Sequence, residues 1–119
     1  MFHATVGIAN PHDISRSFEE RFWVDTVAFY TSIPEDRLQQ LGIAPARSRD
    51  LIFADGSVEH RLLSEARITI AELGESATCP IVFAPAGSPY LLGTTALSAF
   101  GVRADPTTRQ LKPAVVIIA

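Results

Sequence analysis

The chain has 119 residues, of which 47% are hydrophobic and 19% are charged, and its formal net charge is −3. This composition is typical of a single globular domain over residues 1–119 with one core, and it excludes a disordered chain. Its pI of about 5.5 argues against nucleic acid as a partner, because domains that bind a duplex are usually basic.

The first part of the chain predicts two strands and then a helix. Residues 2–9 alternate between apolar and polar side chains and stop at an Asn-Pro breaker pair. Residues 17–26 predict a second strand, although their alternation is imperfect. Residues 33–43 predict the clearest helix, because Pro34 suits a first turn, two acidic residues follow it, and Gly42 supplies a C-terminal stop.

The middle of the chain predicts a long hairpin over residues 50–73. Its centre is Asp55-Gly56, a dipeptide favoured in two-residue hairpin turns. A short apolar arm at 51–53 leads into this turn, and a long arm over 58–73 leaves it.

The last part predicts further strands and a second helix. Residues 77–85 are a strand candidate, and residues 90–102 run from an apolar strand end through Gly93 into a short helix. Residues 103–119 predict an Asp-Pro turn and a terminal strand. The chain is therefore expected to be mostly β with two short helices.

Cysteine content and apolar runs bear on the compartment. The single cysteine, Cys79, excludes an intrachain disulfide and favours a reducing compartment, so we expect a cytoplasmic protein. Cys79 itself is expected to be a small buried hydrophobe. The first residues do not show the basic and then apolar pattern of a signal peptide, so none is expected. The longest apolar run, AVVIIA at 114–119, is too short to cross a bilayer, so no membrane span is expected.

An ionisable residue ends the second predicted strand. The run FWVDTVAFYTSIP, residues 22–34, places Asp25 directly after apolar and aromatic side chains. A carboxylate there must find partners or keep its proton, because burying a lone charge is unfavourable. One interpretation is an aspartate that caps its own turn, which is common for Asp-Thr. The other is a carboxylate that carries chemistry.

Three stretches taken together resemble the retropepsin-like aspartic proteases of clan AA. VDTVA followed by YTSIPEDRLQQLGI is similar to that family's Asp-Thr/Ser-Gly-Ala, short strand, proline and helix ending in Leu-Gly. ADGSVEHRL matches the flap hairpin of the family in position and character. YLLGTTALSAFGVRADPTTRQLKP is similar to its second signature, in which two apolar residues and glycine precede a helix and an Asp-Pro turn. The resemblance covers the chain from about Phe2 to Pro113.

The resemblance implies an all-β, closed barrel-like domain that works as a homodimer on a peptide or unfolded protein, without a cofactor. Each chain would donate one catalytic aspartate, here Asp25, and the two carboxylates would share a proton. One would activate water while the other polarises the scissile carbonyl. Thr26 matches the residue whose hydroxyl joins the two active-site loops across the dimer axis. The remaining matches are the flap tip, Asp55, Gly56 and Ser57, and the support behind the aspartate loop, Leu91, Leu92 and Gly93.

The active-site motif departs from the family at Val27, which stands before Ala28 where the family has glycine. Valine avoids positive φ and fills space through which substrate backbone would approach. Either the loop backbone differs here, or the valine methyls occupy the floor of the cleft. Phe29 adds further bulk beside the site.

Three functions therefore stay open from the sequence. The first is an aspartic peptidase whose activity is weakened by Val27. The second is a catalytically inactive dimer that binds peptides or a protein partner. The third is a stand-alone β-barrel interaction domain in which the Asp-Thr pair is coincidental.

Other chemistries have weaker signals. His3, His12 and His60 show no repeated ligand spacing, so no metal site is expected. Ser88 is not part of a G-x-S-x-G elbow, and the Gly-Thr-Thr at 93–95 lacks the spacing of a phosphate-binding loop.

Overall fold

The computed structural model describes residues 1–115, and within them nine strands and two short helices form. In chain order they are β1 (His3–Asn10), β2 (Asp13–Val24), β3 (Thr31–Pro34), α1 (Glu35–Gln40), β4 (Arg47–Ile52), β5 (Val58–Ile70), β6 (Glu75–Ala84), β7 (Leu91–Leu92), α2 (Thr94–Ala99), β8 (Val102–Asp105) and β9 (Gln110–Pro113). Neither helix is long and apolar enough to cross a membrane.

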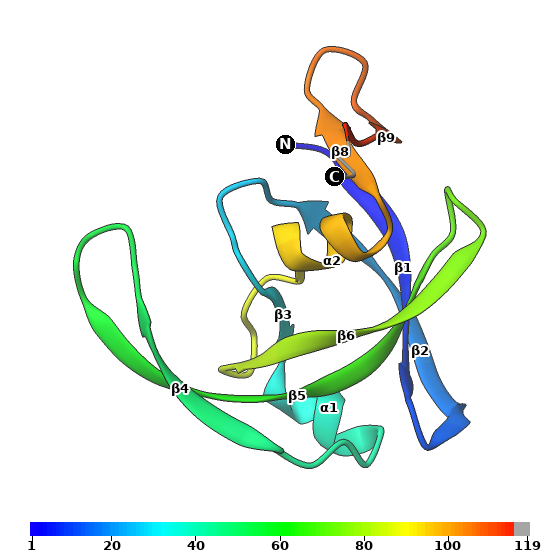
Figure 1. Cartoon of the computed structure of the whole chain (residues 1–119). Helices are drawn as coiled ribbons and strands as arrows, with labels where there is room; N and C mark the ends of the chain where they lie inside the picture. Colours follow the sequence, from blue (N-terminus) through cyan, green and yellow to red (C-terminus); the bar gives the residue numbers. More distant parts are fainter. Residues whose placement is uncertain (116–119) are drawn as a thin grey trace, which may run out of the picture.

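Seven of these strands form one sheet that closes on itself (Figure 1). Their order is β1-β2-β7-β3-β6-β5-β4, and β1 also pairs with β5. This extra pairing joins the ends of a six-strand ring and leaves β4 outside it, attached only to β5. The prediction of an all-β, closed sheet with two short helices is confirmed.

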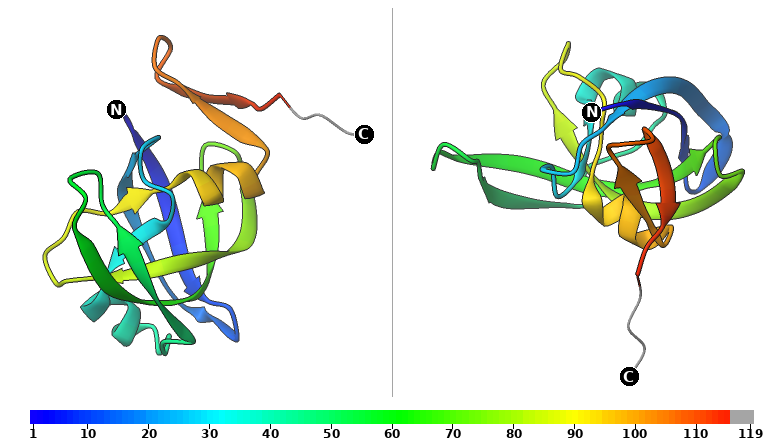
Figure 2. Two further views of the ribbon diagram at one scale, coloured as in Figure 1. Left: turned by 60° about the vertical axis from the view of Figure 1, so that its left-hand side comes forward. Right: turned by 90° about the horizontal axis from the view of Figure 1, so that it is seen from above.

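The long strand β5 connects the closed sheet to a projecting hairpin. Its first part, up to Leu63, pairs with β4, and the part from Leu63 to Ile70 pairs with β6. The view from above shows the β4–β5 hairpin extending away from the ring (Figure 2, right). The first part of β5 is mostly exposed, whereas Ile68 and Ile70 are fully buried in the core.

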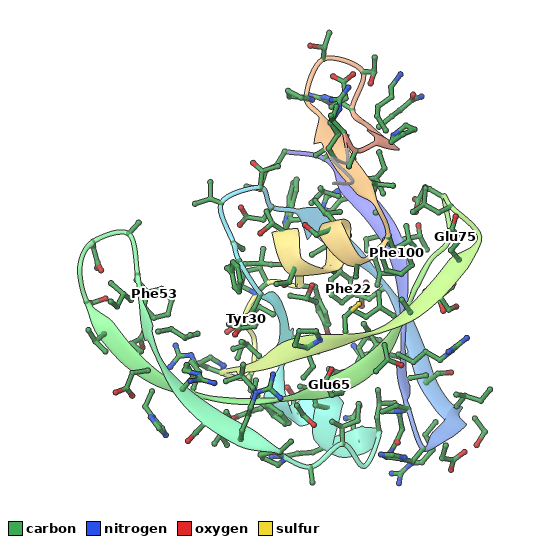
Figure 3. The ribbon with its side chains drawn as sticks, in the orientation of Figure 1. Phe22, Tyr30, Phe53, Glu65, Glu75 and Phe100 are labelled. Atoms are coloured by element: carbon green, nitrogen blue, oxygen red, sulfur yellow. The ribbon has the colours of Figure 1, made fainter. Side chains whose placement is uncertain are left out.

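The core fills the ring with aliphatic side chains and one large aromatic residue. Phe22 of β2 is fully buried and points into the interior, where Tyr90 packs against its ring at 5.3 Å between centroids (Figure 3). Alternate residues of a strand point to opposite faces, so inward positions recur at every second residue. The large side chains that are fully buried include Val6, Ile8, Val24, Ile33, Leu38, Leu63, Ile68, Ile70, Ile81 and Leu92.

Strand β2 is longer than the sequence pattern predicts. The prediction begins at residue 17, whereas the strand begins at Asp13. A tight turn pairs Asn10 with Asp13, so the hairpin with β1 extends the strand through residues that are mostly exposed. Backbone pairing therefore continues where alternation of side chains stops. The strands predicted at 2–9 and 77–85 are present as β1 and β6.

The hairpin between β4 and β5 does not turn in two residues, as the sequence predicts. The last strand pair is Ile52 with Val58, and the Phe53 N–H donates to the Ser57 carbonyl at 2.8 Å. Gly56 has a φ of 85° and donates to the Phe53 carbonyl at 2.9 Å. Asp-Gly thus belongs to a three-residue loop that ends in a left-handed glycine bulge, another common hairpin connection.

The long arm of this hairpin also ends earlier than predicted, at Ile70 instead of Leu73. Gly74 has a φ of 64°, and its N–H donates to the Ile70 carbonyl at 2.9 Å. A left-handed glycine allows the chain to reverse here at little steric cost. The turn connects β5 to β6 as neighbouring antiparallel strands.

The first helix forms where it is predicted but is shorter than the 33–43 pattern. Helix α1 covers Glu35–Gln40, and Pro34 precedes it as the last residue of β3. Strand β3 lies where the family resemblance implies a short strand before the proline, although the residue pattern alone did not predict it. Gly42 adopts a φ of 74°, as a C-terminal glycine stop requires.

The C-terminal part differs most from the sequence prediction. The predicted Asp-Pro turn is present, and the Asp105 carboxylate accepts a hydrogen bond from the Thr107 N–H at 2.9 Å. The chain returns at once as β9, which pairs with β8 in a separate two-stranded sheet. The strand predicted within 114–119 is absent at Ala114 and Val115, and residues 116–119 lie outside the described residues.

Cys79 is buried on β6, as predicted. Its side chain is excluded from solvent, and this burial raises the pKa of the thiol, with a smaller contribution from the nearby Glu65 carboxylate. Both effects favour the neutral thiol, so Cys79 acts as a core hydrophobe.

Candidate functional site

A cleft of about 450 Å³ separates the loop that follows β2 from the β4–β5 hairpin. Tyr30 on the loop and Phe53 near the hairpin tip face the space between these two segments (Figure 3). Polar and apolar side chains both line it, namely Asp25, Val27, Ala28, Phe29, Tyr30, Ser32, Leu51, Ile52, Phe53, Ala54, Arg61, Val82 and Leu91.

Asp25 stands at the mouth of the barrel because β2 ends beside β7. Val24 pairs in parallel with Leu92, and the Asp25 N–H donates to the Leu92 carbonyl at 3.0 Å. The Oδ1 atom of Asp25 accepts hydrogen bonds from the N–H groups of Val27 at 2.9 Å and Ala28 at 3.2 Å. The aspartate therefore caps its own turn. Its Oδ2 atom forms no hydrogen bond within residues 1–115, so this oxygen is available to a ligand or a second chain.

The segment Leu91–Leu92 and Gly93 lies directly behind the aspartate loop. The Gly93 N–H donates to the buried Thr31 hydroxyl at 3.1 Å. A Cβ atom on Gly93 would lie 2.4 Å from the carbonyl carbon of Tyr30, so only glycine lets the two backbones approach this closely. The end of β7 is thus held against the end of the loop by a hydrogen bond between Gly93 and Thr31, which are 62 positions apart in the sequence.

Helix α2 holds the other end of the loop. The Thr94 N–H donates to the Ala28 carbonyl and the Thr95 N–H donates to the Phe29 carbonyl, both at 2.9 Å. The Thr95 hydroxyl donates to the Phe29 carbonyl as well. The sequence analysis placed Thr94 and Thr95 at the start of a short helix but gave them no role at the loop, because no local pattern shows that they bond to residues 28 and 29.

Thr26 lies on the opposite side of this loop from the cleft. It is exposed and lines a second hollow, of about 330 Å³, between the N-terminal segment and the β8–β9 hairpin. Within the described part of the chain its hydroxyl has no hydrogen-bond partner. The loop at 25–27 therefore separates two hollows, with Asp25 and Val27 facing one and Thr26 facing the other.

The conformation of Val27 bears on the two alternatives from the sequence, a changed loop backbone and valine methyls in the cleft. Among residues 1–115 the only non-glycine residue with positive φ is Arg109, so Val27 is not in a left-handed conformation. Its side chain is 85% exposed and lines the cleft beside Phe29, which is 63% exposed. Val27 therefore adopts a backbone conformation that valine tolerates, and its exposed side chain lies in the cleft.

The hairpin contributes different residues to the cleft from those expected. Asp55, Gly56 and Ser57 form the tip of the loop, but the cleft is lined by Phe53 and Ala54, which precede them. The sequence analysis did not select these two positions, because a hairpin motif identifies the turn and says nothing about which flank faces inward.

Comparison of the chain with models of known protein families finds no match, and comparison with curated proteins finds none either. The candidate site is therefore argued from its own geometry. Within residues 1–115 no group of three or more His, Cys, Asp or Glu side chains could hold a metal ion.

The tip of the hairpin supplies a prediction about pH. Hydrogen bonds from Ser57 lower the pKa of the Asp55 carboxyl below its ordinary value of 3.8. The carboxylate therefore keeps its hydrogen bond from the Ser57 N–H at any pH above 3.8, and it loses this bond only as the pH falls through the lowered pKa. We expect the amide chemical shift of Ser57 in NMR spectra to titrate with a midpoint below 3.8. Asp55→Asn should abolish this titration, and a midpoint at or above 3.8 in the wild type would contradict the assignment.

Proposed function

We propose that this chain is one half of an aspartic peptidase, active as a homodimer in which two Asp25 side chains share a proton. The observation that supports this most strongly is the placement of Asp25. It lies in the wall of a cleft beside a projecting hairpin and is fixed through its own turn and Leu92, and one of its carboxylate oxygens has no hydrogen bond to any group in residues 1–115. That arrangement holds a carboxylate rigidly while it remains accessible.

The proposed chemistry is hydrolysis of a peptide bond. Two carboxylates about 3 Å apart cannot both ionise, so one holds a proton while the other is charged. The charged carboxylate takes a proton from water as the water oxygen adds to the scissile carbonyl carbon. The protonated one donates a hydrogen bond to the carbonyl oxygen. Collapse of the adduct then breaks the C–N bond, the nitrogen leaves as an amine with the proton that the carboxylate took from water, and the pair is left with one proton as before.

Assembly into a dimer is part of the same proposal, because one chain supplies only one Asp25. The surface around Thr26 supports it. This surface consists of the N-terminal segment, Thr26 and the β8–β9 hairpin, and it includes the hollow that Thr26 lines. Met1 and Val115 are 75% and 90% exposed, so apolar side chains are available for burial by a second copy. The Thr26 hydroxyl, which has no partner among residues 1–115, would hydrogen-bond across the axis.

A second candidate function is a catalytically inactive dimer that binds peptides. The exposed side chains of Val27 and Phe29 favour it, because they place apolar bulk in the cleft where the substrate backbone would approach. The same side chains would bury apolar surface of a bound peptide. The two candidates share the dimer and the cleft and differ only in cleavage.

One experiment tests the proposal as a whole. Light scattering at roughly tens of micromolar, a range in which obligate dimers persist, should give the mass of a dimer. The same sample should cleave a denatured protein, and cleavage should peak at acidic pH, where the pair holds one proton. A dimer that binds the denatured protein without cleaving it would favour the second candidate. A monomer would contradict both.

Val27→Gly is expected to increase cleavage, or affinity for a transition-state analogue of aspartic proteases, by about tenfold or more. The change removes a side chain that is 85% exposed in the cleft, and it gives the substrate backbone more room. It should also lower the free energy of unfolding by about 0.5–1 kcal/mol, because glycine has more freedom in the unfolded chain. The measurement is cleavage of a denatured protein by wild type and variant from acidic to neutral pH.

Val58→Gly provides the matched control, since Val58 is also an exposed valine but does not line the cleft. It should cost stability without increasing cleavage. Equal activity of the wild type and Val27→Gly would show that the valine does not restrict the cleft.

A further inference from the structure

Two arginines lie directly opposite each other on the β4–β5 hairpin. The register of the two strands pairs Arg49 with Arg61. Directly opposed residues of an antiparallel pair project from the same face, and like charges in this position destabilise the pairing. Arg61 lines the cleft, so this face of the hairpin is the one turned toward the Asp25 loop.

Only part of this positive charge is neutralised. The Arg61 Nη2 atom donates to Glu59 Oε1 at 3.0 Å. Within residues 1–115 Arg49 has no carboxylate within 4.0 Å. Arg61 therefore has one carboxylate partner, whereas Arg49, opposite it, has none among residues 1–115.

The surroundings of Arg61 make its charge effective. Its side chain is 21% exposed, and its guanidinium carbon lies 5.7 Å from the centre of the Phe53 ring. Partial burial beside an aromatic ring strengthens a charge-assisted hydrogen bond, since less water screens it. The neighbouring cleft residues Leu51 and Ile52 are apolar, and among the described residues that line this cleft Arg61 is the one cation.

We propose that the cleft selects extended peptides that carry an acidic side chain among apolar residues, with the carboxylate bound by Arg61 and Arg49. This rests on the proposed function, in which the cleft binds a peptide. The carboxylate supplies the negative charge that the opposed arginines lack, and it converts their repulsion into a shared ion pair. Apolar residues beside it pack on Val27, Phe29 and Phe53.

Binding of matched peptides tests the proposal. The probes are apolar peptides of about eight residues with blocked termini and a non-hydrolysable hydroxyethylene centre, in which Glu, Gln or Lys is placed at each position in turn. Dissociation constants are measured at pH 7, where glutamate is ionised. We expect the best Glu peptide to bind at least about tenfold more tightly than its Gln counterpart, and the Lys peptide to bind most weakly. Raising the salt from about 0.05 M to about 0.5 M should weaken only the Glu peptide.

Variants assign the preference to the arginines. Arg61→Gln should reduce the ratio of Gln to Glu dissociation constants to about one, and Arg49→Gln, at an exposed position, should lower it in the same direction. Arg67→Gln is the matched control, because Arg67 is exposed on β5 but does not line the cleft, and it should keep the full ratio. Melting temperatures establish that each variant is folded. A Gln peptide with a free C-terminus tests whether a terminal carboxylate can replace the side-chain carboxylate. The proposal expects this peptide to bind no better than the blocked Gln peptide.

Each failure has its own pattern. If Glu and Gln peptides bind equally well, the cleft binds peptides as proposed but the acidic preference is overturned. If the preference survives both arginine substitutions, the assignment to Arg49 and Arg61 is overturned. If no peptide binds, the proposed function fails and the acidic preference fails with it.

Discussion

Asp25→Asn lowers any cleavage of a denatured protein by roughly 10²–10⁴-fold, the contribution of a general acid–base group. Asparagine keeps the shape of aspartate, and its amide oxygen can still accept the hydrogen bonds from the Val27 and Ala28 N–H groups. The active-site turn should therefore persist. What is lost is the proton that the pair of carboxylates shares, and with it the base that activates water.

The measurement compares cleavage and stability in the same samples. Because the substitution removes repulsion between two carboxylates, the dimer should be no less stable at neutral pH. Thr26→Ala should instead weaken the dimer, since it removes a hydrogen bond across the axis. Asp13→Asn is the matched control: Asp13 also caps its own turn, through the Ser15 N–H at 3.2 Å, and it does not line the cleft.

Two results would contradict these roles. Strong cleavage that survives Asp25→Asn would exclude the aspartic mechanism. Loss of the dimer in Asp25→Asn, together with an intact dimer in Thr26→Ala, would show that the two residues are assigned the wrong way round.

Gly93→Ala is expected to destabilise the fold by about 3 kcal/mol or more, at the upper end of the effects of overpacking. The added Cβ would lie 2.4 Å from the Tyr30 carbonyl carbon, 2.5 Å from its oxygen and 2.8 Å from the Thr31 nitrogen. These are backbone atoms, so no side chain can rotate away to make room. The strands would have to separate, which would lengthen the hydrogen bond from Gly93 to the Thr31 hydroxyl.

Unfolding in urea and thermal melting measure this effect, and a loss of this size should lower the melting temperature by more than about 10 °C. Gly7→Ala is the matched control. Gly7 is also in the closed sheet, but a Cβ there would lie 3.5 Å from its nearest neighbour, the Cβ of Thr69, which is an ordinary contact. Gly7→Ala should therefore cost less than about 1 kcal/mol. Equal stability of the two variants would show that Gly93 is not a close-approach position.

The sequence by itself determined the features that depend on neighbouring residues. Alternation over residues 2–9 predicted β1, because side chains on a half-buried strand alternate, and the strand candidate at 77–85 is present as β6. Gly42 ended the first helix, and an Asp-Pro pair turned the chain, since both act through local backbone geometry. The capping interpretation of Asp25 is confirmed for the same reason: its partners are two and three residues away.

Only the tertiary structure decided the features that depend on strands far apart in the chain. The pairing of β1 with β5 closes the sheet, and β7 is a strand of two residues that exists because β2 and β3 lie on either side of it. The apolar residues before Gly93 predicted a strand end here, but no local pattern shows which strands flank it. The type of loop at Asp55-Gly56 was likewise decided by where the register of β4 and β5 places the last pair.

The composition of the cleft was decided in the same way. The sequence selected Asp25 and the hairpin, but it indicated no continuous basic face that includes Arg49 and Arg61. These two arginines are twelve positions apart, and the register of an antiparallel pair brings them opposite each other. A shift of that register by one residue would turn the arginines to the other face of the hairpin, because side chains alternate with a period of two. The charge of the cleft is therefore a property of strand pairing, which a linear pattern of residues does not contain.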